Sequence, residues 1–238
     1  MTRRYNSLGC DHSSMFAFTY LVTTEEYRKA VEDPAFFQDN AFVNHQDAVF
    51  ADFYFRAYDA WKAGTVGYVP PAWRIAFGAA DRREVTGMGN VLLGMNAHVN
   101  RDLPLVLYAI GLTRPDGTSR KPDHDRVNDF LNAVNKYLLT EAAKYLDPTI
   151  DDGDLPGTSL DNSAMVQLLV SWREGAWRNA ERLAQAGSAA ERAQVAQEIE
   201  DGAAYTALTL RASYLYNGVT NGTAASRNLY CASHWAKR

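Results

Sequence analysis

Four polar side chains lie close together inside an otherwise apolar stretch and give the sequence its clearest chemical signal. They are Asn96, His98, Asn100 and Asp102. On a helix, residues four apart share a face, so His98 lies beside Asp102 and Asn96 beside Asn100, on faces about 160° apart. A buried polar group without a partner costs about 1–3 kcal/mol, so four such groups need partners. This cluster is therefore the first candidate for a functional site.

The pair His98 and Asp102 is suited to two kinds of chemistry. An imidazole and a carboxylate one turn apart can both bind a divalent transition metal such as Zn, Fe or Mn, or the carboxylate can orient the imidazole as an acid/base group. The HxxxD spacing is much less specific than the HExxH motif of zinc proteases. A third interpretation is a buried hydrogen-bond network that joins helices.

Two further histidines are candidates to complete a metal site. His45 lies in a predicted helix that also carries Asp52, so this helix could contribute a ligand alongside His98 and Asp102, with a bound water as nucleophile or base. An exposed surface histidine is the alternative for His45. His124 precedes Asp125 at the start of another predicted helix, where acidic residues usually cap the helix or stabilise its dipole.

Several catalytic signatures are missing from the sequence. It contains no GxxxxGK[ST] loop, no GxGxxG turn after a strand, no GxSxG elbow, no HExxH and no paired Glu-x-x-His. The acidic segment Asp151, Asp152 and Asp154 lacks the ligand spacing of an EF-hand, so we expect a solvated loop there.

Three functions are consistent with the cluster. The first is an enzyme that uses a metal to hydrolyse a small organic molecule. The second is a metal-free cyclase or isomerase of secondary metabolism, in which His98 oriented by Asp102 moves protons. The third is a non-enzymatic helical module that binds a ligand. For the second, we expect an aromatic substrate pocket formed by Phe53, Tyr54, Tyr58, Trp61 and Trp73.

Apolar residues recur at helical spacing along most of the chain, and no strand-like alternation is sustained. The expected helices cover residues 23–32, 34–61, 71–77, 84–112, 123–146, 161–186 and 188–216, with loops at 113–122 and 147–159 and a polar tail to residue 238. We therefore predict an all-α fold, a single-domain helical bundle of about six to eight helices over residues 1–238.

The helix that carries the cluster contains residues that disfavour a regular helix. Gly87, Gly89 and Gly94 precede the cluster, and Pro104 follows it. Glycine inside a helix costs about 1 kcal/mol relative to alanine, and proline removes a backbone donor. We therefore expect tight helix packing or a bend beside the polar cluster.

Composition limits the partners. The 238 residues are 47% hydrophobic and 22% charged, with a net charge of -4, which gives no general attraction to a phosphate backbone or an anionic membrane. No segment is apolar enough to span a bilayer. We expect a small-molecule substrate and neither nucleic acid nor membrane as a partner; the sequence does not predict the oligomeric state.

The cysteines and the N-terminus favour the cytoplasm. Cys10 and Cys231 are the two cysteines, and neither belongs to a CxxC pair. We therefore expect no disulfide framework. The N-terminal residues lack the apolar run of a signal peptide, so a cytoplasmic location is predicted.

Two segments together resemble a known family. Leu93–Pro104 (LGMNAHVNRDLP), followed after a loop by His124–Asp129 (HDRVND), is similar to the signature of bacterial and fungal proteins grouped as the DUF5995 family. The Asn-x-His-x-Asn-x-Asp core is the most specific part, and the resemblance covers most of the chain. It implies an α-helical fold. It implies no reaction, because the family is defined without one.

Overall fold

Helices form nearly all the regular structure of this protein. The computed structural model describes residues 1–150, 154–155, 158–159, 162–219 and 221–238. Its elements are α1 (Thr2–Leu8), α2 (Ser14–Ala30), α3 (Asn40–Lys62), η1 (Val66–Tyr68), α4 (Pro71–Arg82), α5 (Gly87–Asn96), η2 (Ala97–Asp102), α6 (Leu103–Ile110), α7 (Lys121–Tyr145), η3 (Pro148–Ile150), β1 (Asp154–Leu155), β2 (Thr158–Ser159), α8 (Asn162–Gln185), α9 (Ala189–Ser213) and α10 (Ala224–His234). The strands β1 and β2 form one short antiparallel pair. The all-α prediction is confirmed.

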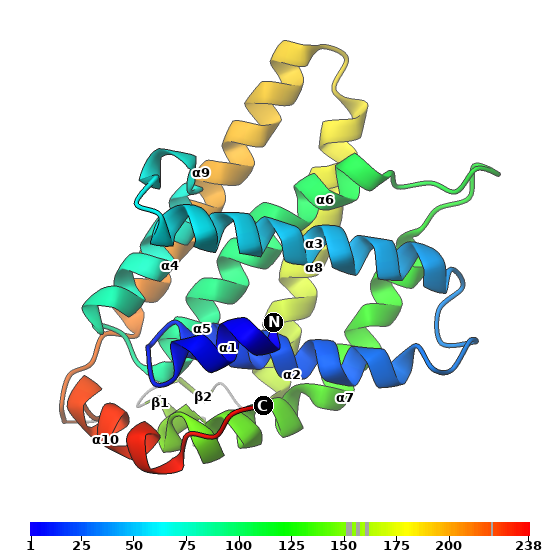
Figure 1. Ribbon diagram of the computed structural model, residues 1–238. Coiled ribbons are helices and arrows are strands. Elements are labelled where there is room, and N and C mark those ends of the chain that lie inside the picture. Colours follow the sequence, from blue (N-terminus) through cyan, green and yellow to red (C-terminus); the bar gives the residue numbers. More distant parts are fainter. Residues whose placement is uncertain (151–153, 156–157, 160–161, 220) are drawn as a thin grey trace.

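The consecutive segments α5, η2 and α6 form the centre of the bundle. They contact α2, α3, α4, α8 and α9, and α2 and α3 cross in front of them in Figure 1. Helix α8 and helix α9 form an antiparallel pair whose far ends project beyond the other helices (Figure 1). A helix that is apolar on all sides is buried on all sides, which explains the central place of this segment.

The central segment is distorted at the polar cluster, as its glycines and proline predict. Residues 97–102 form a π-helix, η2, between two α-helical parts. A π-helical turn inserts one extra residue into a helix and is frequent at functional sites. Upstream, a Cβ on Gly94 would lie 2.4 Å from the Phe16 ring, and one on Gly89 would lie 2.6 Å from Tyr214. Of the two expected outcomes, tight packing or a bend, the structure shows tight packing at Gly89 and Gly94.

Several helix boundaries differ from the prediction. Helix α2 begins at Ser14 instead of Thr23, and α3 begins at Asn40, capped by Asp39, instead of at Pro34. Asp123 does not cap α7; it lies in the first turn and accepts hydrogen bonds from the backbone N–H groups of Gln38 and Asp39. The acidic residues 151 and 152 lie outside the described residues.

The expected polar tail is wrong because it contains a helix. Thr223 and Ser226 form a capping box that starts α10, and this helix lies beside α7 at the bottom of Figure 1. The short helix α1 was also not predicted. Helix α1 is short and has only Tyr5 and Leu8 as apolar residues, so hydrophobic periodicity does not reveal it. Helix α10 buries Arg227 and Cys231, so its place in the fold does not follow from an apolar stripe.

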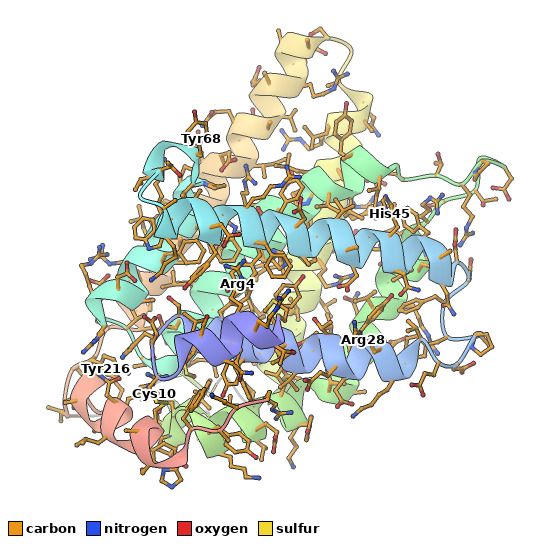
Figure 2. All side chains as sticks on the ribbon, viewed as in Figure 1. Arg4, Cys10, Arg28, His45, Tyr68 and Tyr216 are labelled. Carbon is orange, nitrogen blue, oxygen red and sulfur yellow. A yellow bond between two sulfur atoms is a disulfide. The ribbon has the colours of Figure 1, made fainter. Side chains whose placement is uncertain are left out.

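The expectation of no disulfide framework is also wrong, because the two cysteines form a disulfide. A disulfide joins Cys10, in the connection between α1 and α2, to Cys231 in α10, across 221 positions of sequence. Figure 2 shows Cys10 beside α10. The two chain ends meet there, since the Tyr5 hydroxyl donates to the Ala236 carbonyl. Spacing alone hides such a pair, because the fold brings the ends together. Among the described helices, none has both the length and the apolar composition of a membrane span.

Candidate active site

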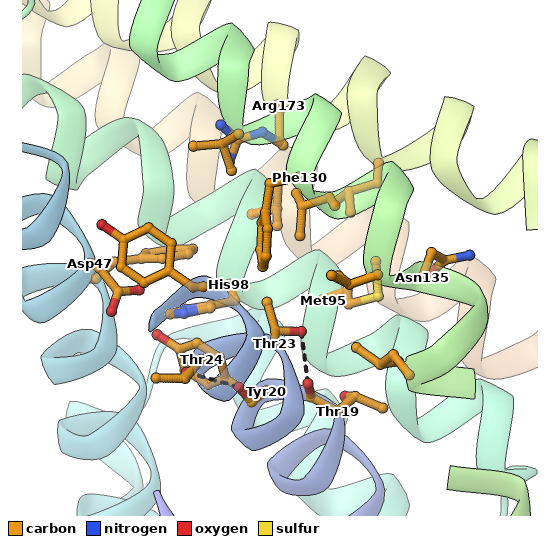
Figure 3. Close-up of a pocket in the computed structure, with 18 of the residues that line it drawn as sticks. Thr19, Tyr20, Thr23, Thr24, Asp47, Met95, His98, Phe130, Asn135 and Arg173 are labelled. Atoms are coloured by element: carbon orange, nitrogen blue, oxygen red, sulfur yellow. Dashed lines mark hydrogen bonds between the residues drawn. The ribbon is translucent and has the colours of Figure 1, made fainter. Parts of the chain in front are cut away.

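A cavity of about 160 Å³ lies between α2, α3, α5, α7 and α8, with η2 at one side. Most of its wall is aliphatic or aromatic, including Phe16, Phe50 and Phe130. Its polar lining residues are Thr19, Tyr20, Thr23, Thr24, Tyr27, Gln46, Asp47, His98, Asn135 and Arg173 (Figure 3). Small-molecule sites are usually concave and mostly apolar, with a few polar groups that fix orientation. The cavity is therefore the best candidate for a ligand site among the described residues.

His98 contributes one nitrogen to an internal pair and leaves the other without a protein partner. Its Nδ1 lies 3.0 Å from the Oδ2 atom of Asp102. Its Nε2 is buried and has no hydrogen-bond partner among the described residues. The Phe50 ring stacks on the imidazole, with 3.4 Å between centroids and 5° between planes. The ring is thus fixed by stacking and by one hydrogen bond.

Burial decides the charge of His98. Desolvation lowers the pKa of its imidazole, although the Asp102 carboxylate opposes that shift. Since the side chain is 4% exposed, the neutral form is expected at pH 7. In that form Nδ1–H donates to Asp102, so Nε2 carries the free lone pair. The site therefore holds an oriented base.

Asp102 is held by more than one donor. Its Oδ2 also accepts a hydrogen bond from Trp73 Nε1 at 2.9 Å, and its Oδ1 accepts one from Arg101 at 2.9 Å. Arg101 in turn contacts Glu200 of α9 at 2.5 Å. With the contact to His98, three donors thus fix the position of this buried carboxylate. Asp102 thus occupies the place of a residue that orients the histidine.

Tyr20 supplies a second polar group near His98. The two rings are 5.0 Å apart in an edge-on arrangement, and the Tyr20 hydroxyl is buried without a partner among the described residues. Burial raises the pKa of this phenol well above its ordinary value, so it keeps its proton at pH 7. It can donate a hydrogen bond to an oxygen of a bound molecule.

Most of the other polar side chains in the cavity wall form hydrogen bonds within the protein or lie at one side of the cavity. The hydroxyls of Thr19, Thr23 and Thr24 donate to carbonyls of their own helix, two of these bonds being drawn in Figure 3. Burial raises the pKa of Asp47, and Arg28 opposes that shift. Few polar groups are thus free to meet a ligand.

The asparagines of the sequence cluster join helices. Asn96 donates to the Ala203 carbonyl of α9, and its own side-chain oxygen accepts from Asn100, both at 2.9 Å. Neither lines the cavity. For this pair the structure shows the hydrogen-bond network that was one of the interpretations of the cluster.

His45 does not approach His98 in the structure. It is exposed on α3 (Figure 2), and Asp52 on the same helix pairs with Arg56 at 2.7 Å. Within the described part of the chain, no group of three or more His, Cys, Asp and Glu side chains is arranged to hold a metal ion. Of the predicted ligands, the structure brings together only His98 and Asp102.

His124 lies behind the cavity wall and contacts Arg173. Its Nε2 is 3.1 Å from the Arg173 carbonyl oxygen, and its Nδ1 is 3.4 Å from the guanidinium. Desolvation, followed by the charge of Arg173, lowers the pKa of His124 well below its ordinary value. The neutral ring therefore donates from Nε2 and accepts at Nδ1, which supports the arginine.

The aromatic residues predicted to line a pocket lie elsewhere. Tyr54, Tyr58 and Trp73 are buried in the main hydrophobic core, and Trp61 packs against that core. None of them lines the cavity, and neither does Phe53. Aromatic residues at helical spacing form one stripe, and here that stripe packs on α4 instead of lining the cavity. Trp73 nevertheless contributes to the site, because its Nε1 donates a hydrogen bond to Asp102.

Sequence reasoning missed Arg173, Tyr20 and the aromatic wall of α2 and α7. Tyr20 precedes the start predicted for its helix, and Phe130 reads as one position of an ordinary apolar stripe. Arg173 is one of several charged residues of its helix and is followed directly by Glu174, so no local signal distinguishes it.

A protein-family model described as "Family of unknown function (DUF5995)" matches residues 1–213. The match spans α1 to α9 and so includes every residue of the cavity wall. No curated protein and no solved structure matches the chain. The predicted resemblance is confirmed, and the family description names no reaction.

Proposed function

We propose that this chain, which belongs to the DUF5995 family, is an enzyme that moves a proton within a small, largely apolar molecule, with His98 as general base. The observation that carries this proposal is the buried Nε2 of His98, which has no partner among the described residues while Nδ1 is held by Asp102. A buried polar atom without a partner costs about 1–3 kcal/mol. A bound molecule with an acidic proton would satisfy it.

The chemistry follows from the charges around the imidazole. Nε2 takes a proton from the bound molecule, and the resulting imidazolium is stabilised by the Asp102 carboxylate through Nδ1–H. The Tyr20 hydroxyl can donate to an oxygen that gains negative charge. When Nε2 returns the proton to another atom, the molecule has isomerised or cyclised and His98 is neutral again. Electrons and protons balance without a further reactant.

A divalent transition metal on His98 is the second candidate. Histidines that bind metals usually donate their other ring N–H to a carboxylate, as His98 does to Asp102. Hydrolysis by a metal-bound water would then be the reaction class. This candidate is weaker because Asp102 already accepts three hydrogen bonds, and no group of three or more His, Cys, Asp and Glu side chains in the described ranges is arranged around His98 to hold a metal ion.

Incubation of the purified protein with a small-molecule extract of bacterial cells tests the proposal without a known substrate. Mass spectrometry would compare the wild type, His98→Gln, and His45→Gln as a control that replaces an exposed histidine. We expect one compound to be converted to an isomer of equal mass by the wild type and the control but not by His98→Gln. Conversion that persists in His98→Gln contradicts the proposal, and a compound that is retained but unconverted supports a binding module.

Elemental analysis of the tag-free wild type beside His98→Ala separates the two candidates. The proton-transfer proposal expects no stoichiometric Zn, Fe or Mn in either protein, even after incubation with the metal. About one equivalent in the wild type that is absent from His98→Ala would replace the first candidate by the second.

A further inference from the structure

Arg173 places a buried positive charge in the wall of the same cavity. Its side chain lies on α8 and is 4% exposed. In the view of Figure 3, Arg173 lies on one side of Phe130 and His98 on the other. Removing an ionised group from water is costly unless the charge is paired or well hydrogen-bonded. The protein or a ligand must therefore supply partners for this guanidinium.

The protein satisfies only part of the guanidinium. Nε donates to Asn128 Oδ1 at 2.7 Å, and Nη2 donates to the His124 carbonyl oxygen at 2.6 Å. Nη2 also faces the His124 ring nitrogen. These partners are neutral. The hydrogen bonds of this guanidinium come from Nε and Nη2, and Nη1 makes none to any described residue. Because Arg173 lines the cavity, a ligand bound there is a possible partner for the two N–H groups of Nη1.

No carboxylate among the described residues lies within ion-pair distance of Arg173, in contrast to most arginines of this protein. The acidic residue with the largest electrostatic effect on it is Asp125. Asp125 is held by Lys121 at 2.7 Å, and Lys121 also contacts Glu174 at 2.8 Å. Burial lowers the pKa of Arg173 to about 10, which still leaves it charged at pH 7.

We propose that Arg173 binds a carboxylate of the ligand, so that the substrate class is small apolar carboxylic acids. A planar carboxylate matches the geometry of a guanidinium. The negative charge of the carboxylate would also neutralise the positive charge of Arg173. The rest of the cavity wall is mainly apolar and suits a hydrocarbon body. This inference rests on the proposed function, because it assigns the two ends of one ligand to Arg173 and His98.

Asp47 is the one residue with a carboxyl group among the described residues that line the cavity. It does not compete with the ligand carboxylate for Arg173. It lies on α3, whereas Arg173 lies on α8. The charge that acts most strongly on Asp47 is that of Arg28, not Arg173. Repulsion between Asp47 and the ligand also favours placing the carboxylate end at Arg173 and the other end toward α2 and α3.

Calorimetric titration with sodium octanoate and with 1-octanol tests the assignment in the wild-type protein. The two probes share a hydrocarbon body and differ in the charged group. We expect octanoate to bind about tenfold to hundredfold more tightly than octanol, since a hydrogen bond to a charged group has that effect on affinity. Equal binding of both probes, or no binding of octanoate, overturns the assignment.

Variants of Arg173 then test whether its guanidinium is the group that binds the carboxylate of octanoate. Arg173→Gln should lose the preference for octanoate, whereas Arg173→Lys should keep part of it. Arg178→Gln, on the exposed face of the same helix, is the matched control and should bind both probes as the wild type does. An unchanged preference in folded Arg173→Gln overturns the assignment. If that variant does not fold, the wild-type comparison and Arg173→Lys still decide.

The result is independent of the base chemistry. If octanoate binding depends on Arg173 and no conversion depends on His98, the ligand assignment stands and the proposed enzyme function fails. If conversion depends on His98 but the converted compound carries no carboxylate, the enzyme function stands and the carboxylate assignment fails.

Discussion

At the scale of single residues, the proposed chemistry depends on which buried polar groups have hydrogen-bond partners inside the protein. The sequence cluster contains two kinds of group. Asn96 and Asn100 are bonded to each other and to α9, whereas His98 keeps one nitrogen without a partner among the described residues. The spacing of residues predicts which side chains share a face, but not which of them meet partners from other helices.

Asp102→Asn is expected to weaken both stability and catalysis. The substitution removes the charge that His98, Trp73 and Arg101 share. Loss of one partner from a buried charged group costs about 3–5 kcal/mol, which denaturant unfolding would measure. Turnover of the compound found with the wild type should fall by about tenfold or more. Wild-type turnover in folded Asp102→Asn would show that the carboxylate does not orient the base.

Buried histidines are expected to make the protein acid-sensitive. Burial lowers the pKa of His12 to about 4, and it also lowers those of His98 and His124. The unfolded chain takes up protons below about pH 6.5 while the folded protein does not. The free energy of unfolding should therefore be highest above pH 6.5. It should fall toward pH 4 by up to about 1.4 kcal/mol per pH unit for each histidine.

Denaturant unfolding at several pH values measures this slope. His12→Gln should make the slope between pH 6.5 and pH 4 shallower. His45→Gln, which changes an exposed residue, should leave it as in the wild type. A slope that His12→Gln does not alter would mean that His12 carries its proton in the folded protein.

At the scale of elements, the sequence predicts the distortion but not its form. Glycines and a proline around the cluster predict tight packing or a bend, and the structure shows tight packing at Gly89 and Gly94 and a π-helix over residues 97–102. The extra residue of the π-helix η2 depends on contacts with α3, α4, α8 and α9, which no local pattern contains. The same limit explains Arg173, whose role depends on residues of α7.

Gly94→Ala is expected to destabilise the protein. A Cβ at this position meets the Phe16 ring at 2.4 Å, and Phe16 forms part of the cavity wall. Overpacking of this kind costs about 1–3 kcal/mol.

Gly175→Ala is the matched control, since a Cβ there meets nothing within 4 Å. This change inside α8 should instead stabilise the helix by about 0.5–1 kcal/mol. Thermal unfolding of both variants gives the comparison. A stabilised Gly94→Ala variant would contradict the close packing of α2 on α5.

At the scale of the whole molecule, the fold class could be predicted from helical periodicity and the contact between the chain ends could not. The disulfide between Cys10 and Cys231 encloses nearly the whole chain. Disulfides that persist are typical of oxidising compartments, which does not agree with the cytoplasmic location that we predicted from the sequence. The cytoplasmic location stays a prediction, and the thiol state of the purified protein bears on it directly.

Removal of the disulfide should lower the free energy of unfolding. A cross-link that closes a long loop stabilises a protein by about 2–5 kcal/mol, mainly by restricting the unfolded chain. Denaturant unfolding of Cys10→Ser/Cys231→Ser should show this loss, and a reductant should shift the wild type but not the variant. Two free thiols in the native wild-type protein, found by thiol titration, would contradict the bond.

The most direct test of His98 as the general base is nitrogen NMR of the protein labelled with ¹⁵N-histidine. The variant His98→Gln assigns the signals. We expect Nδ1 of His98 to carry the proton and Nε2 to be unprotonated at pH 7, and the Nε2 signal to shift when the ligand binds. Two protonated nitrogens at pH 7, or a proton on Nε2 with a bare Nδ1, would mean that the cavity contains no free base and would contradict the proposed function.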